Sequence, residues 1–158
     1  MKSHKIGFLI ILVAIVLFIV NSCSNKETDS KKKAGFIDLT KARQQVEALA
    51  QQFSVEFRSK DSIALANHYL PNGMIGSAKG YENILSTWSK MIQNASEKGT
   101  PYLIFITNSV TTDEEYIIEL GQTQWADENG NVKREGGKYV VVYKQEGGEL
   151  KIYRDWGL

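Results

Sequence analysis

The residues around position 100 divide the chain into a helical part and an extended part. Before Gly99 and Pro101, apolar residues recur every three or four positions, as they do on one face of a helix. After Pro101 the chain is rich in Val, Ile, Thr and aromatic residues in long runs, which is typical of β-strands. Helices that precede strands in this way predict an α+β domain, with the helices on one face of a mostly antiparallel sheet.

Three helices are predicted in the first part. The first covers residues 39–60, and the second is short, begins after Asp61 and ends before Pro71, because proline disfavours helix in the residue before it. Asn72-Gly73 then predicts a turn. The third helix has one apolar face over residues 81–95 and is terminated by the glycine and proline near position 100.

Four strands are predicted in the second part, over residues 102–111, 115–126, 132–145 and 149–156. Their short, turn-like connections indicate an antiparallel meander. Both faces of the last two strands are substantially apolar, so that one face can pack on the helices and the other needs cover. We therefore expect a homodimer through the outer face of the sheet.

Strict alternation on the last strand predicts which of its residues share a face. It places Lys151, Tyr153 and Asp155 on one face and Leu150, Ile152, Arg154 and Trp156 on the other, unless a bulge intervenes.

The first 35 residues have the composition of an export signal and a tether. Lys2 and Lys5 flank the start of an apolar run over residues 6–20, which is short for a membrane span and is followed by Asn21-Ser22-Cys23. Residues 1–22 are therefore predicted to be a signal peptide, and polar, lysine-rich residues 23–35 a flexible tether. An uncleaved anchor and an ordinary signal peptide remain alternatives.

Cys23 at the cleavage point resembles the lipobox of bacterial lipoproteins. The resemblance implies that the Cys23 thiol is lipidated and that the protein is anchored to the membrane of the cell envelope. Ser24 stands where an aspartate retains some lipoproteins at the inner membrane, so the resemblance implies the outer membrane, facing the periplasm or the cell surface.

The composition of the remaining chain excludes several kinds of site. Cys23 is the only cysteine, and His68 is the only histidine after the predicted cleavage point, so that cysteine or histidine-rich metal sites, disulfides and thiolate catalysis are excluded. Acidic residues slightly outnumber basic ones from residue 36 onward, and no basic stripe with interleaved aromatics occurs, which argues against nucleic-acid binding. We expect no metal and no cofactor.

Residues 39–158 resemble the SnoaL-like branch of the nuclear transport factor 2-like superfamily. The stretch SAKGYENI at residues 77–84 resembles the glycine-led start of that family's third helix. The stretches GKYVVVYK at residues 137–144 and GELKIYRDW at residues 148–156 resemble its last hairpin. The resemblance implies that residues 36–158 form a cone-shaped, cystatin-like domain of three helices on a strongly curved sheet, whose mouth holds ligands and which commonly dimerises.

One departure from the family lowers the expectation of catalysis. In the ketosteroid isomerase branch of the superfamily, the general base lies just after the second helix, but here Tyr69 is followed by residues 70–73 without any acid. Abstraction of a proton next to a carbonyl requires such a base within hydrogen-bond reach. Whether the domain is an enzyme stays open, and we favour a non-catalytic function.

The candidate site residues follow from the expected cone. Glu119 and Asp155 are the carboxylates set within strands, and each is a candidate catalytic or ligand-binding acid if it faces the cone, although solvent exposure is an equal alternative. Trp88 also fits a core position of the third helix. The aromatic residues expected in the wall of the cone are Tyr69, Trp88, Tyr139, Tyr143 and Tyr153.

Three functions fit these residues. The first is a binding domain for a small amphipathic ligand or a protein segment, which we favour because no acid–base pair of defined spacing occurs. The second is an enzyme of the cyclase, dehydratase or isomerase type that uses a pocket carboxylate with tyrosine donors. The third is a dimeric interaction module whose cone is filled by its own aromatic side chains.

Overall fold

The computed structural model describes residues 37–113 and 115–158. The predicted signal peptide, the tether and Cys23 lie outside these residues. The compact unit formed by residues 36–158 contains a hydrophobic core of its own, as expected of a domain that folds independently. No helix among the described residues has both the length and the apolar character needed to cross a membrane.

The three predicted helices are present. Helix α2 spans Leu39–Arg58 and is capped by Asp38, whose carboxylate accepts hydrogen bonds from the Thr40 and Lys41 amides. Helix α3 spans Ser62–Asn67 and is capped by Asp61, and helix α4 spans Tyr81–Glu97. Their apolar faces are buried, with Val46, Phe57, Leu65, Ile84 and Trp88 at most 2% exposed.

A six-stranded sheet follows the order β2-β1-β6-β5-β4-β3. The four predicted strands correspond to β3–β6, and each pairs antiparallel with the next one along the chain, which confirms the meander. The strand bounds are β1 Tyr69–Ile75, β2 Ala78–Lys79, β3 Tyr102–Asp113, β4 Tyr116–Ala126, β5 Val132–Glu146 and β6 Glu149–Gly157.

The prediction of a turn at Asn72-Gly73 was wrong, because these residues lie within β1. This strand pairs parallel with β6, where Tyr69 lies opposite Ile152 and Ile75 lies opposite Asp155. Gly73 is buried there, and a Cβ atom at this position would lie 2.9 Å from the Ile152 carbonyl oxygen. The glycine therefore serves close packing of two strands.

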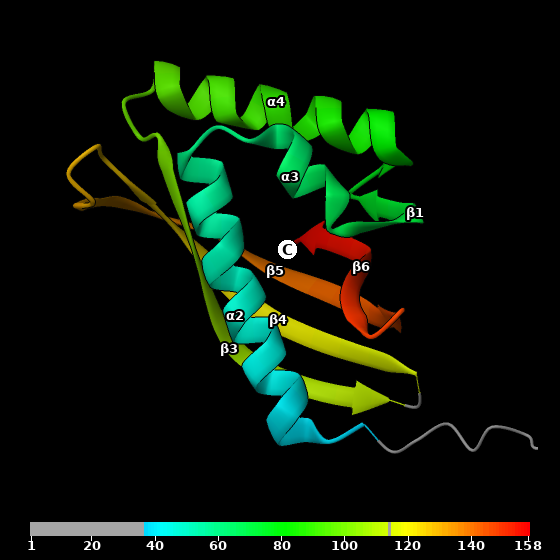
Figure 1. Cartoon of the computed structure of the whole chain (residues 1–158). Helices are drawn as coiled ribbons and strands as arrows, with labels where there is room; N and C mark the ends of the chain where they lie inside the picture. The colour runs from blue at the N-terminus through cyan, green and yellow to red at the C-terminus, as the bar shows by residue number, and fades with distance from the viewer. Residues whose placement is uncertain (1–36, 114) are drawn as a thin grey trace, which may run out of the picture. The chain divides into compact units, whose positions relative to one another are not determined.

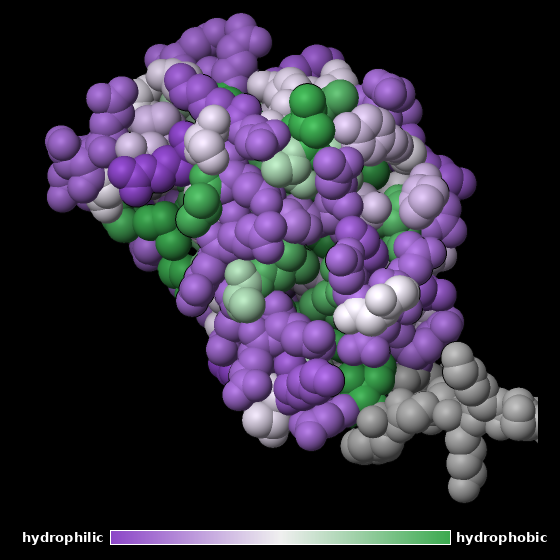
Figure 2. All heavy atoms as spheres, viewed as in Figure 1, coloured by the Kyte–Doolittle hydropathy of each residue, from purple (hydrophilic) through white to green (hydrophobic). Residues whose placement is uncertain are grey.

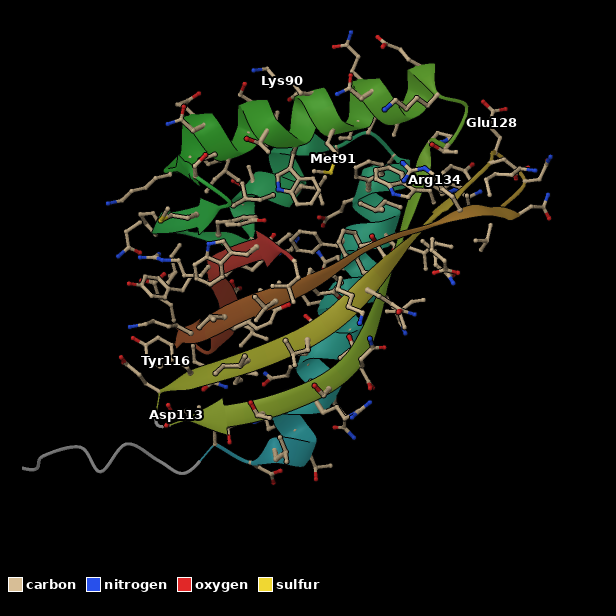
Figure 3. The ribbon with its side chains drawn as sticks, turned by 180° about the vertical axis from the view of Figure 1, so that it is seen from behind. Lys90, Met91, Asp113, Tyr116, Glu128 and Arg134 are labelled. Atoms are coloured by element: carbon tan, nitrogen blue, oxygen red, sulfur yellow. The ribbon has the colours of Figure 1, made fainter. Side chains whose placement is uncertain are left out.

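Helices α2, α3 and α4 lie on one side of the curved sheet, and β1 lies beside β6 beneath α4 (Figure 1). In Figure 3, seen from behind, Lys90 points away from the sheet while Met91 lies on the side of α4 that faces it. The core between the two layers combines the buried face of each helix with the inward side chains of the strands. The expected α+β architecture, three helices on a strongly curved and mostly antiparallel sheet, is confirmed.

Strand β6 contains a β-bulge that moves Asp155 to the inner face. Tyr143 lies opposite Ile152 and Val142 lies opposite Arg154, so that Tyr153 has no partner on β5. Strict alternation grouped Asp155 with Lys151 and Tyr153, and this grouping was wrong. With one extra residue in the strand, Ile152 and Asp155 both face inward, while Tyr153 and Arg154 both face outward.

Candidate functional site

A cavity of about 470 Å³ lies between the helices and the inner face of the sheet. This volume falls in the range of about 300–1,000 Å³ that is usual for small-molecule pockets. The walls are mainly apolar, and the exposed residues Gly76, Ser77 and Lys138 lie where the cavity reaches the surface. The apolar and aromatic side chains of the wall include Phe53, Trp88, Met91, Leu103, Phe105, Trp125, Val141 and Ile152.

Glu119, on β4, is the most deeply buried polar residue of the wall, at 1% exposed. Its Oε1 atom accepts hydrogen bonds from the hydroxyls of Thr107 and Tyr139 at 2.6 and 2.8 Å, and its Oε2 atom accepts one from Tyr143 at 2.5 Å. Burial and the charge of Glu119 raise the pKa of both Tyr139 and Tyr143 above the usual range, so that these hydroxyls stay protonated and donate.

Asp155, on β6, is the second carboxylate of the wall and is only half-buried. Its Oδ2 atom accepts a 2.7 Å hydrogen bond from the Tyr69 hydroxyl, whereas Oδ1 accepts none from the described residues. The enclosure of the carboxyl group in the wall, with a smaller contribution from the charge of Glu119, raises the pKa of Asp155 to about 6, against the lowering effect of the Tyr69 hydrogen bond. Asp155 therefore changes its charge near neutral pH, with one oxygen free.

The indole Nε1 of Trp88 is a buried donor without a hydrogen-bond partner in the described part of the chain. Trp88 is 2% exposed and lines the cavity from α4. Its ring packs edge-on against Phe53 and Phe105, with centroids 5.8 and 6.5 Å away. Burial raises the pKa of the neighbouring Tyr69 hydroxyl, and the Trp88 indole N–H opposes this effect, so the indole N–H lies on the Tyr69 side of the ring.

The structure brings most of the candidate residues together. Glu119, Asp155, Trp88, Tyr139 and Tyr143 all line the cavity. Tyr69 stands behind Asp155 rather than in the wall, with its hydroxyl on the carboxylate. The sequence left open whether Trp88 belongs to the core or to the wall of the cone, and in the structure it belongs to both.

Tyr153 was wrongly expected in the wall. It lies on the outer face of the sheet, 6.1 Å from the ring of Tyr116, and the guanidinium of Arg154 stacks on it at 3.6 Å. The physical reason is the bulge, which places Tyr153 and Asp155 on opposite faces although strict alternation had grouped them on one. The ring of Tyr116 itself lies at the end of the β3–β4 hairpin, near Asp113 (Figure 3).

Sequence reasoning missed Thr107 as a partner of Glu119. Thr107 lies on β3 opposite Gly121, just before a bulge at Asn108 that shifts the β3–β4 register. Gly121 also has a role, because a Cβ atom there would overlap the ring of Tyr139 and would lie 2.7 Å from the Ile106 carbonyl oxygen. The glycine lets the Tyr139 ring cross β4 and reach Glu119. In the sequence, the available signal for this arrangement was Gly121 itself, two positions after Glu119 within the same strand.

His68 is the C-cap of α3 and is half-buried. Its Nε2 atom lies 2.8 Å from Glu56 Oε2, and its ring packs 4.8 Å from Phe53. It lines a second, shallower groove rather than the cavity. Within residues 37–113 and 115–158, no three His, Cys, Asp or Glu side chains are placed to hold a metal ion.

The helices, the curved sheet and the pocket between them define a domain of the nuclear transport factor 2-like, cystatin-like fold. Solved structures of that fold are similar to this chain. A cystatin-like domain of unknown function from Nostoc punctiforme has a TM-score of 0.61 and 13% identity, with 76% of this chain and 78% of that chain covered. An NTF2-like protein from Novosphingobium aromaticivorans has a TM-score of 0.53 and 13% identity, with coverage of 78% and 90%.

An NTF2-like protein of unknown function from Shewanella oneidensis has a TM-score of 0.57 and 14% identity, with 73% of this chain and 97% of that chain covered. At such low identities the likeness shows the fold alone, and the fold expected from the sequence is confirmed at that level. No protein-family model matches the sequence. No curated protein matches it either.

Proposed function

We propose that the domain binds one small amphipathic ligand in the cavity. The observation that carries this proposal is a ligand-sized volume that combines apolar walls with one carboxylate oxygen, Asp155 Oδ1, that accepts no hydrogen bond from the described residues. An apolar wall binds the body of a ligand, and a few placed polar atoms orient its head. The same volume argues against a cone filled by its own aromatic side chains.

Blocking the cavity tests this proposal. Ala78 lines the cavity and Ala48 is exposed on α2, so Ala78→Phe and Ala48→Phe form a matched pair. With residues 36–158 and the neutral dye Nile red, we expect saturable fluorescence enhancement for wild type and Ala48→Phe, and at least about tenfold weaker binding for Ala78→Phe. Equal binding by all three proteins would contradict ligand binding in this cavity.

A proton-transfer enzyme is the second candidate, and one observation favours it. Asp155 has a pKa of about 6 and a free oxygen in the cavity, which are the properties of a general base near neutral pH. Such a carboxylate would take a proton from a carbon next to a carbonyl and return a proton from solvent. In heavy water, wild type should speed deuterium uptake at the carbons next to the carbonyl of 4-phenyl-2-butanone, and Asp155→Asn should not. Exchange no faster than in buffer would contradict this candidate for such ketones.

We also propose that the domain is held at the cell envelope by a lipid on Cys23, probed by the labelling experiment in the Discussion. Its support is the apolar run over residues 6–20 that ends at Ser22-Cys23. Two or more acyl chains, as bacterial lipoproteins carry, anchor firmly where a single chain does not. A ligand-binding domain on such a tether would work close to the membrane surface.

Self-association through the outer face of the sheet is the last part of the proposal. Leu120, Val140 and Trp156 lie opposite one another on three neighbouring strands, and Leu120 and Trp156 are 46% and 37% exposed. The opposite side of the domain, shown in Figure 2, is mostly hydrophilic, with only small separate apolar areas. An apolar row on the uncovered face of a sheet favours a partner there.

A further inference from the structure

The cavity holds two carboxylates but no basic side chain that pairs with either. Among the described residues, the ion pairs involve neither Glu119 nor Asp155. Lys138 lies at the rim and forms no ion pair with another described residue, and Arg134 stacks on the ring of Trp125 at 4.6 Å. Carboxylates that are removed from water are normally paired with a cation or a metal, whereas the inner wall around Glu119 and Asp155 contains no basic side chain and the lining lysine lies at the rim.

The two acids differ in the number of carboxylate oxygens that remain free to accept a hydrogen bond. Both oxygens of Glu119 accept hydrogen bonds from fixed hydroxyls, so that its charge is held in place by Thr107, Tyr139 and Tyr143. Asp155 uses only Oδ2, on Tyr69, and keeps Oδ1 free in the cavity. A ligand donor therefore has one good position, at Asp155 Oδ1, with a second negative charge nearby.

The groups that face Asp155 are neutral or acidic. They are Tyr69 from β1, Glu119 from β4, and Tyr139 and Tyr143 from β5. The wall contributed by the helices, including Phe53 and Trp88, carries no charge. The faces of aromatic rings attract cations, and more strongly where water is excluded.

We infer that the ligand is a small organic cation, a protonated amine with an apolar body, whose ammonium group donates to Asp155 Oδ1 while its body lies against the aromatic wall. This inference rests on the proposed ligand binding and names its chemical class. The ligand supplies the positive charge that the protein does not.

A series of matched probes tests the inference. The compounds 4-phenylbutylamine, 4-phenylbutanol and 4-phenylbutyrate share one apolar body and carry a cation, a neutral hydroxyl and an anion. Calorimetric titration of residues 36–158 at pH 8 should show the amine binding at least about tenfold more tightly than the alcohol, and the carboxylate most weakly. Equal affinities of the amine and the alcohol would overturn the cation inference and leave ligand binding intact. Absence of binding by both would overturn the proposed function as well.

Two variants test whether the ammonium group of the ligand binds to Asp155. Asp155→Asn should weaken amine binding by about tenfold or more and change alcohol binding by less than about twofold, because it removes the charge but not the shape. Asp113→Asn, at the exposed end of β3, is the matched control and should leave both affinities unchanged. An unchanged preference for the amine in Asp155→Asn would overturn the assignment of the ammonium group to Asp155.

The pH gives a second readout. The amine stays protonated between pH 5 and 8, so any loss of its binding at pH 5 reports protonation of the protein. Wild type should lose most of its preference for the amine at pH 5, and Asp155→Asn should show no such dependence. A preference that is equal at both pH values in wild type would overturn the inference.

Discussion

Tyr69 donates a 2.7 Å hydrogen bond to Asp155 Oδ2 and thereby joins strand β1 to strand β6 inside the domain. Two backbone hydrogen bonds hold the same pair of strands, from the Ile152 amide to the His68 carbonyl at 2.8 Å and from the Gly76 amide to the Asp155 carbonyl at 2.7 Å. Asp155 is therefore held in place by hydrogen bonds to both its backbone carbonyl and its carboxylate.

Asp155 should make the domain less stable as the pH rises. Its folded-state pKa of about 6 lies above the ordinary value of 3.8, so the folded state binds more protons between these values, and the free energy of unfolding falls from about pH 4 to about pH 6. After discounting for the partial exposure of the residue, we expect a loss of about 2 kcal/mol. Asp155→Asn keeps an acceptor for Tyr69 and should remove this loss.

Urea unfolding of wild type and Asp155→Asn at pH 4 and pH 7 provides the measurement. The variant should gain stability relative to wild type at pH 7 but not at pH 4. A difference between the two proteins that does not change with pH would show that Asp155 titrates normally.

Glu119→Ala should destabilise the domain by about 2–4 kcal/mol. The change leaves the hydroxyls of Thr107, Tyr139 and Tyr143 without their acceptor in a buried position. Glu119→Gln keeps an acceptor and should cost less. Glu135→Ala is the control, because Glu135 is exposed and its side chain bonds, among the described residues, to Gln124 alone. This change should alter the unfolding free energy by less than about 0.5 kcal/mol. A Glu119→Ala variant as stable as this control would show that the hydroxyl cluster contributes nothing.

Gly121→Ala should cost about 2–3 kcal/mol, since the added methyl group overlaps the Tyr139 ring and forces it away from Glu119. Gly137→Ala adds the same group where no atom lies within 4 Å, and should be nearly neutral. Thermal unfolding of both variants measures the difference. Equal melting temperatures would mean that the Tyr139 ring has room to move.

Residues 36–158 should form a dimer that Leu120→Lys dissociates. Leu120 is the most exposed residue of the apolar row on the outer face, and a lysine there places a charge from each protomer in the proposed interface. Val55→Lys, at a 65% exposed position on α2, should remain dimeric. Sedimentation velocity at micromolar concentration distinguishes these outcomes, and a monomeric wild type would rule out the dimer.

Cys23 should carry a fatty acid in a bacterial host. The full chain should incorporate a clickable palmitate analogue, and Cys23→Ala should not. The control is Ser22→Ala, which keeps the thiol and a small residue before it. Equal labelling of wild type and Cys23→Ala would disprove lipidation at this residue.

Much of the fold could be predicted because its elements are long and periodic. Helix α4 and strands β3–β6 follow repeats of about 3.6 and two residues over many positions. Strand β1 was missed, since Pro71 and Asn72-Gly73 are local turn signals. Pairing with β6 and the burial of Tyr69 and Leu70 override these signals. Such long-range pairing has no local mark in a single sequence.

The site was predictable in composition but not in geometry. Glu119 and Asp155 could be selected because acids inside apolar strands are unusual. Their orientation could not, because it depends on the registers of β4 and β6, and no glycine or proline marks the bulge at Tyr153. The partnership of Thr107 with Glu119 likewise follows from the pairing of β3 with β4.

The bulge in β6 also affects how this chain should be aligned with others. In a regular last strand, the inward residue after the position of Ile152 comes two residues later, whereas here it comes three residues later, at Asp155. An ungapped alignment with a regular strand would thus match Asp155 with an outward-facing residue. It would match Arg154 with the inward-facing residue that corresponds in space to Asp155. A gap of one residue at Tyr153 restores the correspondence. Homologues that share this acid would be recognised only by a comparison that allows the gap.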